Sequence, residues 1–207
     1  MYGAYPNSVA VRVGIDEVGR GCWAGPLVAA AVALPDGYRV DGLRDSKKLS
    51  LRQREAVVAA LRADRALDWA LGWVWPAELD AWGMTQAVRQ AMRRAADGLS
   101  GTYPSTIIDG NYNYLVGYRQ DILGDITTLT RADDTVPSVS AASVIAKVAR
   151  DNYMRRIAAE YPRYGFDAHV GYGTALHRQA LTRYGPCALH RRSFAPVIAV
   201  LETGSHD

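Results

Sequence analysis

Apolar positions along this chain follow two periods, which predict short strands alternating with longer helices. Apolar or β-branched runs bounded by turn residues predict strands at 9–15, 27–34, 66–74, 106–108 and 125–129. Helical spacing of apolar residues predicts helices at 49–63, 76–97 and 138–157, with Ser50 as a possible N-cap of the first and a break near Gly83 in the second. Residues 161–193 are expected to form a loop, a short helix and another loop. Strands first and helices last indicate an α/β domain with a helical C-terminal extension.

Composition sets the class of protein. With 207 residues, of which 49% are apolar, the chain can bury a core as a single domain over 1–207, with about 145–200 as its helical C-terminal part. This composition excludes a disordered chain, and no apolar run approaches the roughly 20 residues that a membrane span needs. The N-terminus shows no secretory signal, and the two cysteines make no disulfide framework. A cytoplasmic protein is the simplest expectation.

Charge is distributed unevenly along the chain. Residues 1–146 hold 15 basic and 16 acidic residues, whereas residues 147–207 hold 9 basic and 5 acidic residues. A basic C-terminal part would suit a nucleic-acid backbone, and a solvated helical surface explains it equally well. Charge alone therefore does not decide between these two interpretations.

Acidic residues follow the predicted strands at three places: Asp16 and Glu17, then Asp109, then Asp133 and Asp134. Each taken alone also fits a turn or a helix cap. Open α/β sheets bind ligands at strand ends, so these carboxylates are expected to converge. Clustered carboxylates repel one another unless a cation lies between them, and oxygen ligands suit Mg²⁺ or Mn²⁺. Such a cluster could hold two Mg²⁺ ions and support in-line attack of water on a phosphodiester.

A glycine-rich turn, Gly19-Arg20-Gly21, follows the first acidic pair. Glycines allow a ligand to approach the backbone closely, and Arg20 could meet a phosphate. The same residues also fit a plain tight turn between two strands. The spacing matches neither the dinucleotide fingerprint nor the phosphate-binding loop of nucleotide hydrolases.

These residues resemble the ribonuclease HII family of bacteria. The similarity lies in collinear blocks over about residues 9–197, at Ile15–Gly21, Ala24–Val28, Asp45–Leu49, Ile108–Asn111, Asp133–Pro137, Ser140–Asp151, Tyr164–Phe166, His169, Gly171–Thr174, His177 and His190–Phe194. The resemblance implies a ribonuclease-H-like fold, which is a mixed five-stranded sheet flanked by helices. It also implies a metal-dependent endonuclease that hydrolyses the RNA strand of RNA/DNA hybrids.

The resemblance further implies cleavage 5′ of single ribonucleotides embedded in duplex DNA, with 3′-hydroxyl and 5′-phosphate ends and a role in ribonucleotide excision repair. Position by position, it assigns the metal-binding and catalytic carboxylates to Asp16, Glu17, Asp109 and Asp133. It assigns substrate contacts to Gly19, Arg20, Gly21, Ser46, Lys47 and Tyr172. The expected cofactor is Mg²⁺ or Mn²⁺, two per active site, and the expected form is a monomer without a membrane partner.

Two departures from the family pattern stand out. Val170 occupies a position where the family usually has lysine, and Asp134 lies beside Asp133, so either could be the fourth ligand. Three other functional interpretations are alternatives to the ribonuclease HII assignment. The related type III enzymes carry an extra N-terminal domain, and the 15 residues before Asp16 argue against that expectation here. A non-catalytic nucleic-acid-binding module would not need four carboxylates, and a hydrolase of small phosphate esters would act on non-nucleic substrates.

Overall fold

The computed structural model describes residues 10–39, 42–43 and 49–204. Two compact units make up the chain. The first comprises Met1–Val18, Val28–Trp73 and Arg89–Val148, and the second comprises Gly19–Leu27, Val74–Val88 and Ala149–Asp207. The predicted helical part at 145–200 falls almost wholly in the second unit, which also takes two short segments from earlier in the chain. The expectation of a single catalytic domain over 1–207 stays a prediction.

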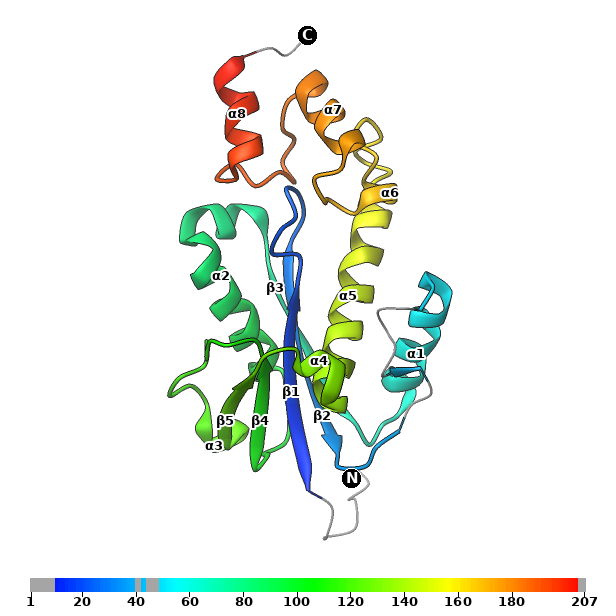
Figure 1. Cartoon of the computed structure of the whole chain (residues 1–207), viewed down its shortest axis with the longest axis vertical. Coiled ribbons are helices and arrows are strands. Elements are labelled where there is room, and N and C mark those ends of the chain that lie inside the picture. The colour runs from blue at the N-terminus through cyan, green and yellow to red at the C-terminus, as the bar shows by residue number, and fades with distance from the viewer. Residues whose placement is uncertain (1–9, 40–41, 44–48, 205–207) are drawn as a thin grey trace. The chain divides into compact units, whose positions relative to one another are not determined.

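The predicted mixed five-stranded sheet is confirmed (Figure 1). Its strands are β1 (Val11–Val18), β2 (Leu27–Pro35), β3 (Asp68–Val74), β4 (Ser105–Asp109) and β5 (Asp125–Leu129). They lie in the order β3-β2-β1-β4-β5. β1 pairs antiparallel with β2 and parallel with β4, and β4 pairs parallel with β5. β2 is buried along its whole length, as expected for a continuous apolar run at the centre of a sheet.

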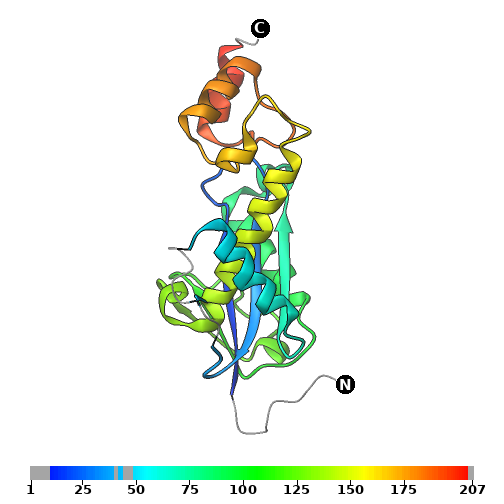
Figure 2. The ribbon, with the colours of Figure 1, turned by 90° about the vertical axis from the view of Figure 1, so that its right-hand side faces the viewer.

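Helices flank this sheet. They are α1 (Leu51–Ala63), α2 (Pro76–Asp97), α3 (Gln120–Leu123), α4 (Ala132–Thr135) and α5 (Pro137–Ile157). Ser50 caps α1 in a reciprocal capping box with Gln53, as the sequence predicts. Gly83, with φ of 74°, interrupts α2 at the predicted break. Buried side chains of α1 and the first part of α5 form one apolar cluster with β2, and Figure 2 shows these helices over the same face of the sheet.

Two glycines let helices approach the sheet closely within the first unit. A Cβ at Gly14 of β1 would lie 2.2 Å from the backbone of Ser138 and Val139 in α5. A Cβ at Gly72 of β3 would lie 1.9 Å from the carbonyl oxygen of Ala91 in α2. Neither glycine has a positive φ, so close packing alone explains both.

Gly72→Ala is expected to lower the free energy of unfolding by about 2 kcal/mol, because the added methyl forces α2 away from β3. Chemical denaturation of purified protein measures this loss. Gly21→Ala is the matched control, because a Cβ there would meet nothing within 4 Å. Equal stability of the two variants would contradict the close approach of α2 at Gly72.

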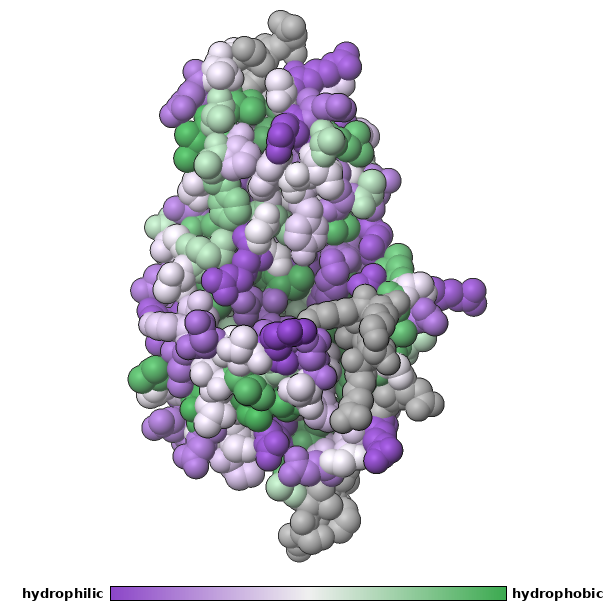
Figure 3. Space-filling model, in the orientation of Figure 1, coloured by the Kyte–Doolittle hydropathy of each residue, from purple (hydrophilic) through white to green (hydrophobic). Residues whose placement is uncertain are grey.

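The second unit is mainly helical and has its own core. Its helices include α6 (Phe166–His169), α7 (Ala175–Tyr184) and α8 (Ala195–Thr203). Ala24, Met154, Tyr164 and Phe166 are among the buried residues of this core. No helix among the described residues is long and apolar enough to cross a membrane. The face drawn in Figure 3 is covered largely by hydrophilic and intermediate side chains.

The structure corrects two local expectations. Residues 161–193 contain two helices, α6 and α7, where one short helix was expected. The first strand was expected to end before Asp16 and Glu17, but β1 continues to Val18 and pairs both residues with β2, opposite Ala30 and Ala29. Asp16 is consequently part of the sheet and only 7% exposed. A buried carboxylate in a strand is costly unless it has partners, which makes its surroundings informative.

Candidate active site

Asp16 and Asp109 lie on adjacent parallel strands of the first unit. In the register of β1 and β4, Ile15 is opposite Ile108, so Asp16 and Asp109 are the next residues on their strands. Both strands run in the same direction, and the two carboxylates therefore reach the same edge of the sheet. The predicted convergence of these two acidic sites is thus explained by strand register.

Electrostatics at this edge are dominated by negative charge. The pKa of Asp16 is raised to about 8, first by burial and then by the neighbouring charges of Glu17 and Asp109. Two hydrogen bonds oppose this shift: one is donated by the Ser143 side chain, and the other by the backbone N–H of Glu17, 2.7 Å from Oδ1 of Asp16. Burial first, and then the charges of Glu17 and Asp109, therefore favour the protonated form of Asp16 in the absence of a cation.

The helix α4, which contains Asp133, begins beside the end of β4. The backbone N–H of Ala132 donates to Oδ1 of Asp109 at 2.7 Å, which fixes the start of α4 against the end of β4. Asp133 follows directly, and its carbonyl oxygen accepts a hydrogen bond from Ser140 Oγ at 2.5 Å. Asp134 instead forms an ion pair with Arg131 at 3.2 Å. Asp133 stays the predicted fourth carboxylate, while the carboxylate of Asp134 pairs with Arg131.

Asp133→Asn is expected to lower kcat on a cleavable substrate about a hundredfold or more, whereas Asp134→Asn is expected to change it less than about threefold. The reason is that the Asp134 carboxylate is paired with Arg131. Single-turnover cleavage rates of the two variants measure the difference. The reverse order would mean that the resemblance is aligned one residue out of register here.

The chemistry of the donor set fits a hard divalent cation. Carboxylate oxygens are the ligands that Mg²⁺ and Mn²⁺ prefer, and a cation would offset the repulsion that raises the pKa of Asp16. Among the described residues, no three His, Cys, Asp or Glu side chains already stand close enough together to hold a metal ion.

The glycine turn and Tyr172 lie together in the second unit. Gly19 has a φ of 92°, and a Cβ there would lie 2.5 Å from Nε of Arg150, so the close packing and the φ both require glycine. The hydroxyl of Tyr172 shares a hydrogen bond with the thiol of Cys22, which follows Gly21 directly. The backbone N–H of Trp23 donates to the carbonyl of Gly171 at 2.9 Å. Tyr172 keeps 38% of its surface exposed.

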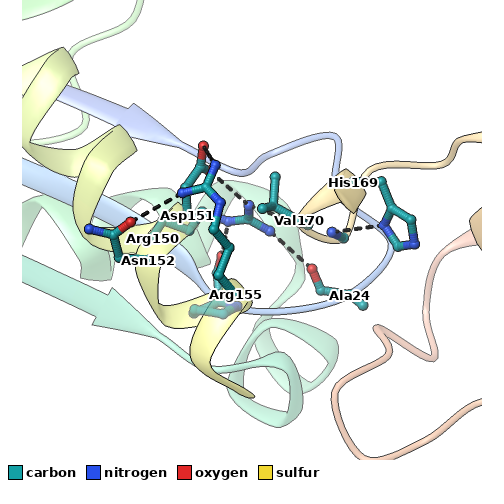
Figure 4. A network of polar contacts seen from close by, with 9 residues as sticks. Ala24, Arg150, Asp151, Asn152, Arg155, His169 and Val170 are labelled. Atoms are coloured by element: carbon teal, nitrogen blue, oxygen red, sulfur yellow. Dashed lines mark hydrogen bonds and ion pairs between the residues drawn. The ribbon is translucent and has the colours of Figure 1, made fainter. Parts of the chain in front are cut away.

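Two arginines that hold this turn were assigned a different role from sequence. Arg150 and Arg191 belong to the basic excess that predicted either a solvated surface or phosphate contacts, yet both are fully buried. Arg150 donates to the carbonyl oxygens of Pro26, Val170 and Ala24 at 2.8 to 3.0 Å, two of which appear in Figure 4. The sequence signals available were the collinear blocks that contain both arginines and the place of Arg150 one helical turn after the apolar Ala146.

Arg191 also donates hydrogen bonds to the backbone of the glycine turn and the residues that follow it. Its Nε donates to the carbonyl of Gly25 and its Nη1 donates to the carbonyl of Arg20, both at 3.0 Å. Burial, and next the charge of Arg150, lower the pKa of Arg191 to about 10, so it stays charged at neutral pH. The backbone of the glycine turn is therefore fixed by charge-assisted hydrogen bonds.

Three further sites bear on the sequence assignments. Ser46 and Lys47, expected near substrate phosphates, lie outside the described residues. Val170, where the family usually has lysine, is 7% exposed and has a positive φ of 44°, which is uncommon for a β-branched residue. The carbonyl of Val170 accepts a hydrogen bond from Arg150, so the backbone at this position is part of the interior of the second unit.

The chain is similar to known proteins along nearly its whole length. The family model described as Ribonuclease HII matches residues 13–197. The chain is 42% identical to Ribonuclease HII of Bordetella avium over 196 residues, which cover 95% of this chain and 93% of the relative. It is 43% identical to Ribonuclease HII of Hyphomonas neptunium, over 91% of this chain and 95% of the relative.

Solved structures agree with the sequence match. The ribonuclease H2 of Pyrococcus horikoshii superposes with a TM-score of 0.78 at 24% identity, covering 93% of this chain and 98% of that one. The RNase HII of Archaeoglobus fulgidus, solved in a complex with PCNA, gives 0.73 at 26% identity, with 89% and 95% covered. Bst-RNase HIII, solved with Mn²⁺, gives 0.70 at 20% identity, with 95% and 70% covered. Since the family model spans 13–197 and its relatives align along nearly the whole length, this chain belongs to the ribonuclease HII family.

Proposed function

We propose that this chain cuts the RNA strand of RNA/DNA hybrids and cuts 5′ of single ribonucleotides in duplex DNA, leaving 3′-hydroxyl and 5′-phosphate ends. Family membership makes it a ribonuclease H. The observation that carries the proposal is the meeting of Asp16, Glu17 and Asp109 at one edge of the sheet, where their charges perturb one another. In-line attack by water, with two divalent cations bound, is the reaction we assign to this edge.

The carboxylates would hold Mg²⁺ or Mn²⁺. Asp16, Glu17, Asp109 and Asp133 supply the oxygens, and Ser143 and the N–H of Ala132 orient the carboxylates of Asp16 and Asp109 respectively. When bound, the cations supply positive charge that lets a phosphodiester approach four carboxylates and that stabilises the charge developing in the transition state.

Recognition of the ribonucleotide is assigned to the second unit. The 2′-hydroxyl is the group that distinguishes RNA from DNA at one nucleotide. Backbone atoms of Gly19, Arg20 and Gly21 would contact it, in a turn that Arg150 and Arg191 hold rigid. The exposed ring of Tyr172 would pack against the neighbouring sugar and favour a deoxyribose there. A monomer in the cytoplasm, acting in ribonucleotide excision repair, completes the proposal.

The test uses a labelled DNA duplex that carries one ribonucleotide, with Mg²⁺, with Mn²⁺ and with chelator. An all-DNA duplex of the same sequence is the matched control. We expect one metal-dependent cut 5′ of the ribonucleotide, with 3′ ends that a DNA polymerase extends, and no cut in the control. Binding of the duplex without cleavage under either metal would favour a non-catalytic binding module, and turnover of a small phosphate ester would favour a broader phosphohydrolase.

A further inference from the structure

Two buried histidines of the second unit face each other, and the reaction proposed above does not use them. His177 is fully buried and His190 is 2% exposed, and their Nε2 atoms lie 3.0 Å apart. Phe166 packs against both rings. Burying two imidazoles is costly unless their nitrogens are hydrogen-bonded, so the partners of the remaining nitrogens indicate what the pair is for.

The donor and the acceptor of each hydrogen bond in this pair can be assigned from its partners. Nδ1 of His177 lies 3.0 Å from the carbonyl oxygen of Tyr172, which can only accept, so Nδ1 carries the proton. Nε2 of neutral His177 is then an acceptor, and Nε2 of His190 must donate to it. This leaves Nδ1 of His190 to accept from the backbone N–H of Cys187 at 3.0 Å. The result is a relay from Cys187 through His190 and His177 to Tyr172.

Both histidines are neutral in this arrangement. Burial lowers the pKa of His177 to about 4 and, with the charge of His177 next in importance, lowers the pKa of His190 to about 3. Each therefore keeps one donor and one acceptor at neutral pH, as the relay requires. His169 stacks on His177 with ring centroids 4.4 Å apart, which restricts the His177 ring further.

The relay ends on the backbone of Tyr172 and leaves its ring exposed. The carbonyl of Tyr172 accepts from His177 and from the N–H of Thr174 at 2.8 Å. The backbone N–H of Tyr172 donates to the backbone carbonyl of His169 at 2.9 Å. A Cβ at Gly173 would lie 2.2 Å from the ring of Trp23, so the next residue is tightly packed as well. The segment between α6 and α7 thus has a fixed main chain and an exposed tyrosine ring.

We propose that His177 and His190 are positioning residues, which hold the Tyr172 main chain so that its ring contacts the sugar beside the ribonucleotide and sets the preference for a ribonucleotide–deoxyribonucleotide junction. This inference rests on the proposed function, since it assigns Tyr172 a role on that substrate. The histidines themselves touch no substrate and act only through Tyr172.

Two replacements of His177 separate positioning from packing. In His177→Asn the amide nitrogen takes the place of Nδ1, so the bond to Tyr172 can be kept. In His177→Gln the amide reaches the place of Nε2, so the bond to His190 can be kept while that to Tyr172 is lost. The readout is the ratio of kcat/KM on a duplex with one ribonucleotide to kcat/KM on a uniform RNA/DNA hybrid.

We expect His177→Gln to lower this ratio about tenfold, toward the value for Tyr172→Ala, and His177→Asn to stay within about twofold of the wild type. Tyr164→Phe is the matched control, because it removes a bond to the carbonyl of Gly185 in the same cluster but leaves the relay intact. Its ratio should equal the wild-type ratio even if its Tm falls.

The results distinguish a failure of the positioning role from a failure of the proposed function. If the wild type cuts both substrates and His177→Gln keeps the wild-type ratio, the positioning role is overturned while the proposed function stands. Equal losses on both substrates in the Asn and Gln variants, with a parallel fall in Tm, also overturn it, because they indicate packing alone. If the wild type cuts neither substrate with Mg²⁺ or Mn²⁺, the proposed function fails and this inference falls with it.

Discussion

Replacing Asp109 with asparagine is expected to lower kcat about a thousandfold while the protein keeps its fold. Asparagine retains the oxygen that accepts the N–H of Ala132, so the contact between β4 and α4 survives. It loses the negative charge that would bind a divalent cation. Because Asp109 is also one of the charges that raise the pKa of Asp16, that pKa should fall in the variant, although burial still keeps it high.

The measurement is kcat on the single-ribonucleotide duplex, together with Tm with and without Mn²⁺. A stabilisation by Mn²⁺ in the wild type should shrink or vanish in Asp109→Asn. Asp125→Asn is the matched control, since Asp125 lies at the opposite end of the neighbouring strand and is exposed. Wild-type cleavage by Asp109→Asn would remove this residue from the active site.

Replacing Arg150 with methionine is expected to lower the free energy of unfolding by about 4 kcal/mol. The substitution keeps most of the side chain's volume but leaves the buried carbonyls of Ala24, Pro26 and Val170 without their donor. These carbonyls belong to the segments that carry the glycine turn and precede Tyr172. Cleavage of the single-ribonucleotide duplex should therefore fall as well, even well below the Tm of the variant.

Arg155→Met provides the control on the same helix. Arg155 is 32% exposed and contacts Asn152 and the buried Asp151 (Figure 4). Arg150 remains 3.9 Å from Asp151 in this variant, so the loss of Arg155 should cost less than about 1 kcal/mol. Chemical denaturation of both variants, followed by cleavage assays at a temperature where both are folded, gives the comparison. Equal stabilities would show that the three carbonyl contacts of Arg150 contribute little.

The residues assigned to metal binding and those assigned to sugar recognition divide between the two units. The carboxylates lie in the first unit, and the glycine turn with Tyr172 lies in the second. The chain passes from one to the other between Val18 and Gly19, directly after Asp16 and Glu17. A short covalent connection thus joins the candidate catalytic residues to the candidate recognition residues.

The order of strands and helices was readable from the sequence because it depends on neighbours a few residues apart. The alternation of apolar runs located the strands, Ser50 marked the start of α1, and Gly83 marked the break in α2. The collinear blocks also identified the family that the sequence match confirms. These signals are local, so they can be read without knowing what each segment packs against.

Partners distant in sequence were decided only by the tertiary structure. The register of β1 against β4 made Asp16 and Asp109 neighbours, and burial in the sheet raised the pKa of Asp16. Arg150 looks like a surface charge in the sequence, yet folding surrounds it with carbonyls from segments more than a hundred residues earlier. A local pattern records which face of a segment is buried, whereas the cost of a buried charge depends on the donors and acceptors that folding brings to it.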